Sequence, residues 1–265
     1  MAPNPAVRYH VPTMASRPLT VAERTDFRET SRHADVLRFI DELKGTRPRF
    51  TVESMGKSGK GQEMPALVFG QRSDAKPVVL VIANIHAGEV EGKEACLMLA
   101  RDLPDAVFDK LTVVMVPDYN PDGNDLIDPA NRKLDLAKLE GQIGPDGGVG
   151  TRYTADGINL NRDYMKMEAV ESRNLSKLYA KWQPTLTVDC HTTDGSIHGF
   201  ALTYDTGHIP NAPCAYVEST MLPEISRRLD RRTKIRTFFY GNFVDEKDLS
   251  KGWATYSHRP RYGSH

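Results

Sequence analysis

The stretch PVVLVIANIHAGEVEG, residues 77–92, decides the fold of this chain. Its first part, Pro77–Ile85, is almost entirely apolar and rich in β-branched residues, which favours a buried strand. A short polar loop follows with His86 and Glu89, and the spacing after it favours a helix over Glu91–Leu103. Strand, loop and helix in this order are typical of α/β proteins, whose ligands bind at the carboxyl ends of the strands.

The segments on either side repeat this alternation of strands and helices. Upstream, the apolar spacing between Thr20 and Leu43 predicts one helix, ended by Gly45 and Pro48. The remaining expected elements are the strands Phe50–Met55, Met64–Phe69, Leu111–Val116 and Thr185–Cys190, and the helix Glu168–Trp182. Strand, helix and strand in succession indicate a largely parallel sheet with right-handed crossovers.

Three other regions complete the domain organisation. Residues 1–19 are Pro-rich and are expected to form an irregular arm, so that residues 20–265 make one domain. The Gly-rich segment Asn124–Thr154 is predicted to be a long loop, and such loops in compact domains are usually functional. Beyond residue 191 the pattern is weaker, with a helix expected at Val217–Arg231 and a strand at Lys234–Tyr240.

Composition excludes several classes of function. The 35 basic and 35 acidic residues cancel, so no electrostatic footprint for nucleic acid or a membrane surface exists. The apolar runs are far shorter than the roughly 20 residues that span a bilayer. Three cysteines, Cys96, Cys190 and Cys214, cannot close a disulfide framework. The first residues lack the apolar core of an intact signal peptide, which leaves the compartment open.

The polar residues at the strand ends predict a metal site. His86 and Glu89 follow one buried strand, and His191 follows another, Thr185–Cys190. Two His and one carboxylate are a ligand set of catalytic zinc, which keeps a fourth position open for water. Cys190 is a competing soft ligand, but in a strand it points away from His191 and is expected to be buried.

Four short motifs in order resemble the zinc carboxypeptidase family. They are HAGE (residues 86–89), NPDG (120–123), NLNRDY (159–164) and DCH (189–191). The resemblance implies a single α/β domain, with a mixed, mostly parallel, roughly eight-stranded sheet flanked by helices. It also implies removal of C-terminal residues from peptides by a zinc-activated water and a glutamate base. Members of that family are often secreted or periplasmic.

The resemblance assigns roles to individual residues. It implies that His86, Glu89 and His191 hold one zinc ion per chain. It further implies that Asn161 and Arg162 grip the terminal carboxylate of a peptide or protein substrate, and a planar guanidinium suits that task.

A further arginine of the family polarises the scissile carbonyl group, and its position here is open. Arg132 is the best positional match in the sequence, and Arg152 is its rival. The chain also departs from the family at Asn159, where the family commonly has Asp as the partner of a zinc-binding His. Orientation of that ligand is therefore expected to rest on an amide oxygen or another group.

The glutamate base of the family has no counterpart in the sequence. Its usual spacing from His191 reaches the last residue, His265, and Glu218, Glu224 and Glu246 come too early. We therefore expect a chain that is incomplete at its C-terminus, and that binds peptide ends but turns them over poorly.

Two other functions remain open from the sequence. DCHTT, residues 189–193, is similar to the aspartoacylase and succinylglutamate desuccinylase group, which cleaves N-acyl amino acids. NPDG and NRDY favour the carboxypeptidases instead. A carboxypeptidase-like module without its base, which only binds peptide C-termini, is the third possibility.

Overall fold

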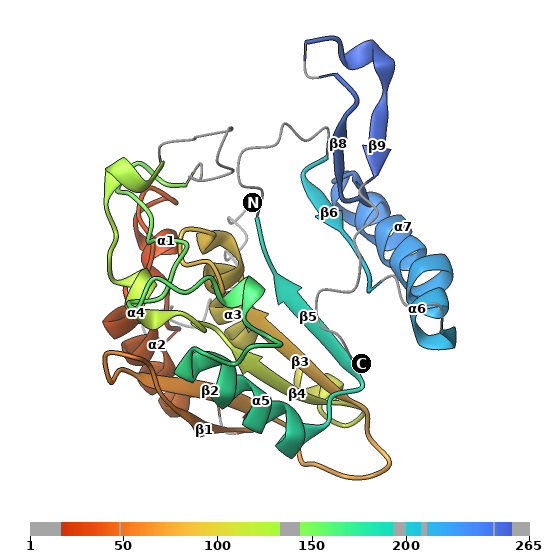
Figure 1. Cartoon of the computed structure of the whole chain (residues 1–265). Coiled ribbons are helices and arrows are strands. Elements are labelled where there is room, and N and C mark those ends of the chain that lie inside the picture. The colour runs from red at the N-terminus through yellow and green to blue at the C-terminus, as the bar shows by residue number, and fades with distance from the viewer. Residues whose placement is uncertain are drawn as a thin grey trace, which may run out of the picture.

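The computed structural model describes residues 17–47, 49–132, 144–192, 200–207, 211–245 and 247–255. Its centre is a five-stranded sheet with the order β1-β2-β4-β3-β5 (Figure 1). The strands are β1 (Phe50–Lys57), β2 (Glu63–Phe69), β3 (Val78–Ala83), β4 (Thr112–Val116) and β5 (Leu186–Cys190). Strands β4, β3 and β5 run parallel, whereas β1 and β2 extend the sheet as antiparallel neighbours.

Helices cover both faces of this sheet. On one face α5 (Val170–Trp182) packs through Leu175, Leu178 and Trp182 against Leu80 and Ile82 of β3. On the other face, α2 (His33–Thr46) and α3 (Val90–Asp102) pack against the alternate residues of the same strands. Neighbouring residues of a strand point to opposite faces, so a sheet covered on both sides needs apolar residues at every position. The expected mixed α/β domain with flanking helices is confirmed.

The N-terminal helix differs from its prediction. Instead of one helix within residues 20–43, the chain forms α1 (Val21–Arg24) and then α2. Asp26 and Phe27 separate them with φ values of 53° and 59°, which lie in the left-handed region and stop a right-handed helix. The prediction of a single helix was therefore wrong, because apolar spacing does not register a local reversal of the backbone.

Short elements occupy the loops at the carboxyl ends of the parallel strands. The NPDG motif forms α4 (Pro121–Asn124), and the Asn120 side chain caps it by accepting a hydrogen bond from the Gly123 N–H. In the same loops, 3-10 turns lie at Pro129–Arg132 and Leu160–Arg162, and two others lie elsewhere, at Asp105–Val107 before β4 and at Leu249–Lys251 in the C-terminal stretch. Within the described ranges, no helix is long and apolar enough to cross a bilayer.

The C-terminal stretch forms smaller units beside the central sheet (Figure 1). Its helices are α6 (Ala212–Tyr216) and α7 (Leu222–Thr233), joined through a π-helical turn. Among the described residues its strands pair only with one another: β6 (Leu202–Tyr204) with β7 (Thr237–Phe239), and β8 (Gly241–Phe243) with β9 (Trp253–Thr255). The described strands thus form a sheet of five and two pairs, where the family resemblance implies one sheet of roughly eight.

Candidate metal centre

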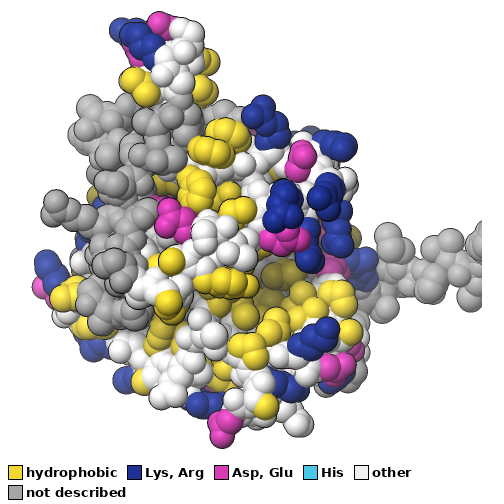
Figure 2. Space-filling model, turned by 90° about the vertical axis from the view of Figure 1, so that its right-hand side faces the viewer, with side chains coloured by type: hydrophobic (Ala, Val, Ile, Leu, Met, Phe, Trp, Pro, Cys, Tyr) yellow, Lys and Arg dark blue, Asp and Glu magenta, His cyan; other side chains and the backbone are white. Residues whose placement is uncertain are grey.

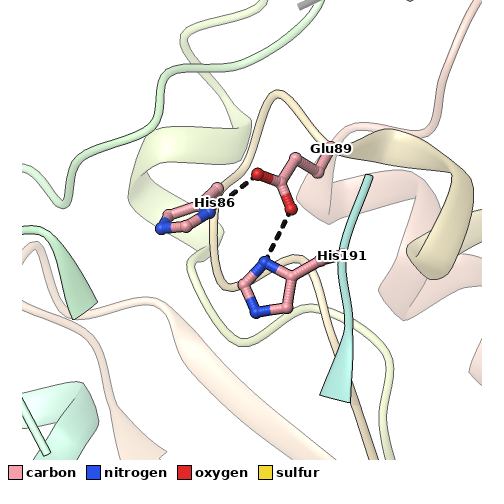
Figure 3. Close-up of side chains that lie close together, drawn as sticks. All are labelled: His86, Glu89 and His191. Atoms are coloured by element: carbon pink, nitrogen blue, oxygen red, sulfur yellow. Dashed lines mark hydrogen bonds and ion pairs between the residues drawn. The ribbon is translucent and has the colours of Figure 1, made fainter. Parts of the chain in front are cut away.

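Three of the residues singled out in the sequence converge at the carboxyl ends of β3 and β5. The Glu89 carboxylate lies between the two imidazoles, with Oε1 2.7 Å from His86 Nδ1 and Oε2 2.9 Å from His191 Nδ1 (Figure 3). One ligand atom from each residue lies within 4.8 Å of the others, and no other group of this kind occurs among the residues that the structure describes. This is the arrangement that the strand-end His residues predicted.

The loop after β3 is shaped by its polar neighbours. Asn84 has a φ of 65°, and its side-chain amide donates to Asp118 Oδ1 at 2.7 Å, at the end of the neighbouring strand β4. The Glu89 N–H then donates to the His86 carbonyl oxygen, which closes a tight turn directly before α3. His86 and Glu89 are thereby brought to the same side of the loop.

The second ring nitrogen of each imidazole also has a partner. His86 Nε2 lies 3.0 Å from the Asn159 amide oxygen, and His191 Nε2 lies 3.1 Å from Asp189 Oδ2. Metal-binding His residues usually donate their other N–H in this way, which fixes the ring and presents the free nitrogen to the metal. The Nδ1 atoms that face Glu89 are therefore the ones suited to a metal.

Burial and donor chemistry fit a zinc ion. The side chains of His86 and Glu89 are 1% and 2% exposed, whereas that of His191 is 28% exposed. Zinc binds His nitrogen and carboxylate oxygen at about 2.0–2.2 Å, so the ligand atoms of one ion lie close together. Three ligands with one side open to solvent match a site that keeps a position for water or substrate.

Charges within the cluster compensate one another. Burial alone would raise the pKa of Glu89, but hydrogen bonds from His191 and His86 outweigh it and lower this pKa to about 2. Burial would likewise lower the pKa of His191, but the charge of Asp189 and the hydrogen bonds to Asp189 and Glu89 raise it to about 10. A proton on His191 therefore neutralises Glu89, and a metal ion would take the place of that proton.

Of the two candidate arginines, Arg152 lies at the cluster. Its guanidinium Nη1 is 3.3 Å from His86 Nδ1 and 3.7 Å from Glu89 Oε1. Arg132 instead donates to the Gly144 carbonyl oxygen and pairs with Asp146, and among the described residues it forms no bond with the three ligands. The arginine whose sequence position matched best, Arg132, is thus not the one nearest the candidate metal ligands.

A close approach of two backbones places Arg152. The Ala87 N–H donates to the Thr151 carbonyl oxygen at 3.1 Å, and the Thr151 N–H donates to the Gly123 carbonyl oxygen at 3.0 Å. A Cβ on Gly150 would lie 2.6 Å from the Gly123 oxygen and 2.7 Å from the Ala87 oxygen, so only glycine fits there. The loop predicted over residues 124–154 is in this way tied to the His86 loop.

The Asn-Arg pair is linked to the candidate metal ligands through Asn159. The Asn159 amide oxygen that faces His86 also accepts from the Asn161 N–H at 3.0 Å. Arg162 follows in the same 3-10 turn, and its Nη1 donates to the Asn161 carbonyl oxygen. The neighbouring Asp163 carboxylate is buried and accepts from the N–H groups of Glu168 and Ala169, before α5.

The remaining candidates lie elsewhere. Cys190 is half-buried and packs with the apolar side chains beneath α3, as its place in the strand predicted. Glu224 pairs with Arg227 and Arg228 on α7, Glu218 is exposed on the turn before it, and Glu246 lies outside the described residues. The contact between Asp189 and His191 was not predicted from the sequence. The spacing could have indicated it, because residues two apart in a strand lie on the same face and Asp189 precedes His191 by two.

Comparisons with known proteins agree with this geometry. A profile of the zinc carboxypeptidase family matches residues 36–212. Carboxypeptidase 2 of Trichophyton rubrum is 24% identical over 148 residues, which cover 51% of this chain and 23% of the relative. Carboxypeptidase Z of Mus musculus is 27% identical over 150 residues, which cover 50% of this chain and 21% of the relative. The matched part thus spans less than a quarter of either relative.

Solved carboxypeptidase structures share the fold. A metallo-carboxypeptidase from Pseudomonas aeruginosa superposes with a TM-score of 0.55 at 18% identity, over 83% of this chain and 54% of that one. A putative carboxypeptidase A from Shewanella denitrificans gives a TM-score of 0.55 at 21% identity, over 81% and 54%. At these identities the likeness extends to the fold alone.

Proposed function

Because the chain belongs to the zinc carboxypeptidase family, we propose that it is the zinc-binding part of a metallocarboxypeptidase, which hydrolyses C-terminal residues of peptides. The observation that carries the proposal is the convergence of His86, Glu89 and His191 with their ligand atoms within 4.8 Å. One zinc ion per chain, when bound there, would act as a Lewis acid that polarises the peptide carbonyl and activates water.

The residues around the metal ligands have separate tasks in this proposal. Arg162, supported by Asn161, binds the free carboxylate at the end of the peptide and so fixes the scissile bond over the metal site. Arg152 takes the role of the carbonyl-polarising arginine in place of Arg132, because its guanidinium already lies 3.7 Å from Glu89. Asn159 and Asp189 hold the two imidazoles in the ligating orientation.

Zinc content is the first test of the proposal. Purified protein should hold close to one equivalent of zinc by elemental analysis, and His86→Ala or His191→Ala should lose most of it. Cys214→Ala is the control, because Cys214 is a soft ligand type on α6, away from the cluster. Full zinc retention in both His variants would refute the metal site.

Substrate recognition is the second test. Peptides with a free C-terminal acid should bind more tightly than the same peptides with a C-terminal amide, and Arg162→Ala should remove the difference. Equal binding of acid and amide by the wild-type protein would rule out the carboxylate anchor. Peptide binding without any release of the terminal residue would instead favour the non-catalytic binding module.

The choice between the two arginines is the third test. If hydrolysis is measured on a free-acid peptide, Arg152→Ala should lower kcat by about 10²–10³-fold, the usual loss when one donor to a developing oxyanion is removed. Arg132→Ala should leave kcat within a few-fold of wild type. The reverse pattern would return the role to Arg132.

A further inference from the structure

The two elements that carry the metal ligands approach each other very closely. Helix α3 begins directly after Glu89, and β5 ends at Cys190, one residue before His191. The distance between α3 and the end of β5 therefore determines how far Glu89 lies from His191. The bonds between them are short: Glu89 Oε2 is 2.9 Å from His191 Nδ1 and 3.0 Å from the Thr192 backbone nitrogen.

Gly92 is the point of α3 that faces β5. A Cβ added to Gly92 would lie 2.6 Å from Cys190 Cβ, 3.3 Å from the Cys190 carbonyl oxygen and 3.6 Å from Ala83 Cβ. Real Cβ atoms essentially never approach other atoms to within 3.0 Å. The need for glycine at this position thus comes from a close approach, whereas the backbone itself is ordinary helix.

Neither partner of this contact can yield by a side-chain rotation. Cys190 Cβ is fixed to the backbone of β5, and β5 is held in register with β3 by the pairing of Ala83 with Cys190. Any added atom at residue 92 therefore has to push the start of α3 away from the sheet. Glu89 lies less than one helical turn from Gly92 and would move with it.

We propose that Gly92 and Cys190 are positioning residues, whose contact sets the spacing of Glu89 and His191 and with it the zinc affinity of the chain. This inference rests on the proposed zinc site. Substitution of Gly92 moves one ligand relative to the other two without removing any of them. The consequence is weaker zinc binding by a protein whose ligands are all present.

The test is the zinc affinity of Gly92→Ala, measured by competition with a chromogenic chelator at a temperature below the unfolding midpoint. We expect the Kd for zinc to rise about 10–100-fold, the range found when groups that orient metal ligands are altered. Gly45→Ala is the matched control, because Gly45 also lies in a helix but has no atom within 4 Å of an added Cβ. Its zinc affinity should equal that of the wild type.

A double variant distinguishes the effect of the Gly92–Cys190 contact on zinc affinity from the effect of a general loss of stability. Cys190→Gly removes the atom that an alanine at residue 92 would meet at 2.6 Å, and leaves the carbonyl oxygen at 3.3 Å, a tight contact that a shift of a few tenths of an ångström relieves. Gly92→Ala combined with Cys190→Gly should therefore bind zinc more tightly than Gly92→Ala alone. If Gly92→Ala does not fold, recovery of folding and zinc binding in the double variant supports the inference.

Three results would overturn it. Wild-type zinc affinity in folded Gly92→Ala would show that the spacing does not depend on residue 92, and would leave the proposed zinc site intact. A double variant no better than Gly92→Ala would show that Cys190 is not the atom in the way. A wild-type protein without zinc affinity would overturn the zinc site and this inference together.

Discussion

Helices α5 and α7 are similar in length, but α5 is buried along one side whereas α7 is not. In α5 the apolar stripe is buried against the central sheet, where Leu175 and Leu178 are 2% and 5% exposed. In α7 no described residue is buried, and Ile225 on its apolar side is 46% exposed. Amphipathic spacing alone therefore does not tell which helix is packed.

The same difference in burial separates the C-terminal stretch, residues 200–255, from the sheet domain, which is the part of the chain up to residue 192. Figure 2, the side of the molecule that lies to the right in Figure 1, shows apolar side chains open to solvent beside groups of Lys and Arg. In this stretch the exposed large apolar residues include Leu202, Tyr216, Ile225, Ile235, Phe238, Val244 and Leu249. All three proposed metal ligands lie in the sheet domain, where the packing fixes their positions.

The largest expected effect contrasts the two helices directly. Leu175→Ala should lower the free energy of unfolding by about 2–5 kcal/mol, because it opens a cavity in the core between α5 and the sheet. Ile225→Ala on α7 should change it by no more than about 0.5 kcal/mol, as is usual for exposed positions. Urea unfolding followed by circular dichroism measures both.

Equal losses in the two variants would contradict this picture. They would mean that Ile225 is packed in solution against a surface that α7 does not contact in this structure. Unchanged m-values are the accompanying control, because they show that both variants unfold with the same change in exposed surface.

A second contrast uses two Asn residues with different tasks. Asn159→Leu should raise the Kd for zinc about 10–100-fold, because it removes the acceptor that orients His86. Asn211→Leu in the C-terminal stretch should leave zinc binding unchanged, since the Asn211 side chain caps α6 by accepting from the Cys214 N–H. Competition with a chelator gives both values.

Asn159→Asp sharpens the same point. A carboxylate keeps the acceptor, so this variant should bind zinc at least as tightly as the wild type. Weakened zinc binding in Asn159→Asp, or none of the expected weakening in Asn159→Leu, would show that the amide oxygen does not orient His86.

In the sheet domain the sequence predicted most of what the structure contains. Continuous apolar runs such as Pro77–Ile85 admit few alternatives to a buried strand, and the residues directly after them must meet at one edge of a parallel sheet. This is why His86, Glu89 and His191 could be brought together from the sequence alone.

The predictions that differed from the structure failed for several physical reasons. Arg152 reaches the cluster because the Gly150 backbone passes within contact distance of the loop at Gly123, and no local pattern encodes that approach. The reversal at Asp26 and Phe27 was missed because the apolar residues that indicated the helix, Val36 to Leu43, all lie beyond it. In the C-terminal stretch the spacing predicted one helix over residues 217–231, where the structure has a π-helical turn over Val217–Met221 followed by α7. The exposure of α7 was not predicted, because it depends on what lies beside the helix.

The smallest expected effect contrasts a buried ion pair with an exposed one. His33 and Asp118 are buried with Nδ1 2.9 Å from Oδ2. Burial opposes the charged imidazolium, but the hydrogen bond to Asp118 and the charges of Asp118 and Asp125 outweigh it and raise the pKa of His33. A raised pKa in the folded state means that the proton stabilises the fold.

That contribution to stability is complete below about pH 6.5, the ordinary pKa of His, and is lost as the pH rises through the raised pKa of the folded state. The stability difference between wild type and His33→Gln should therefore shrink as the pH increases from 6 to 9, by about 1.4 kcal/mol for each unit by which the pKa is raised. Thermal or urea unfolding at several pH values measures this difference.

Glu224→Gln on α7 is the control. Glu224 is exposed, and its ion pairs with Arg227 and Arg228 lower its pKa further, so it stays charged throughout this range. Its effect on Tm should be immeasurably small and independent of pH. A His33→Gln difference that stays constant or grows with pH would mean that His33 is neutral in the folded protein, and the distinction between buried and exposed pairs would fail at this site.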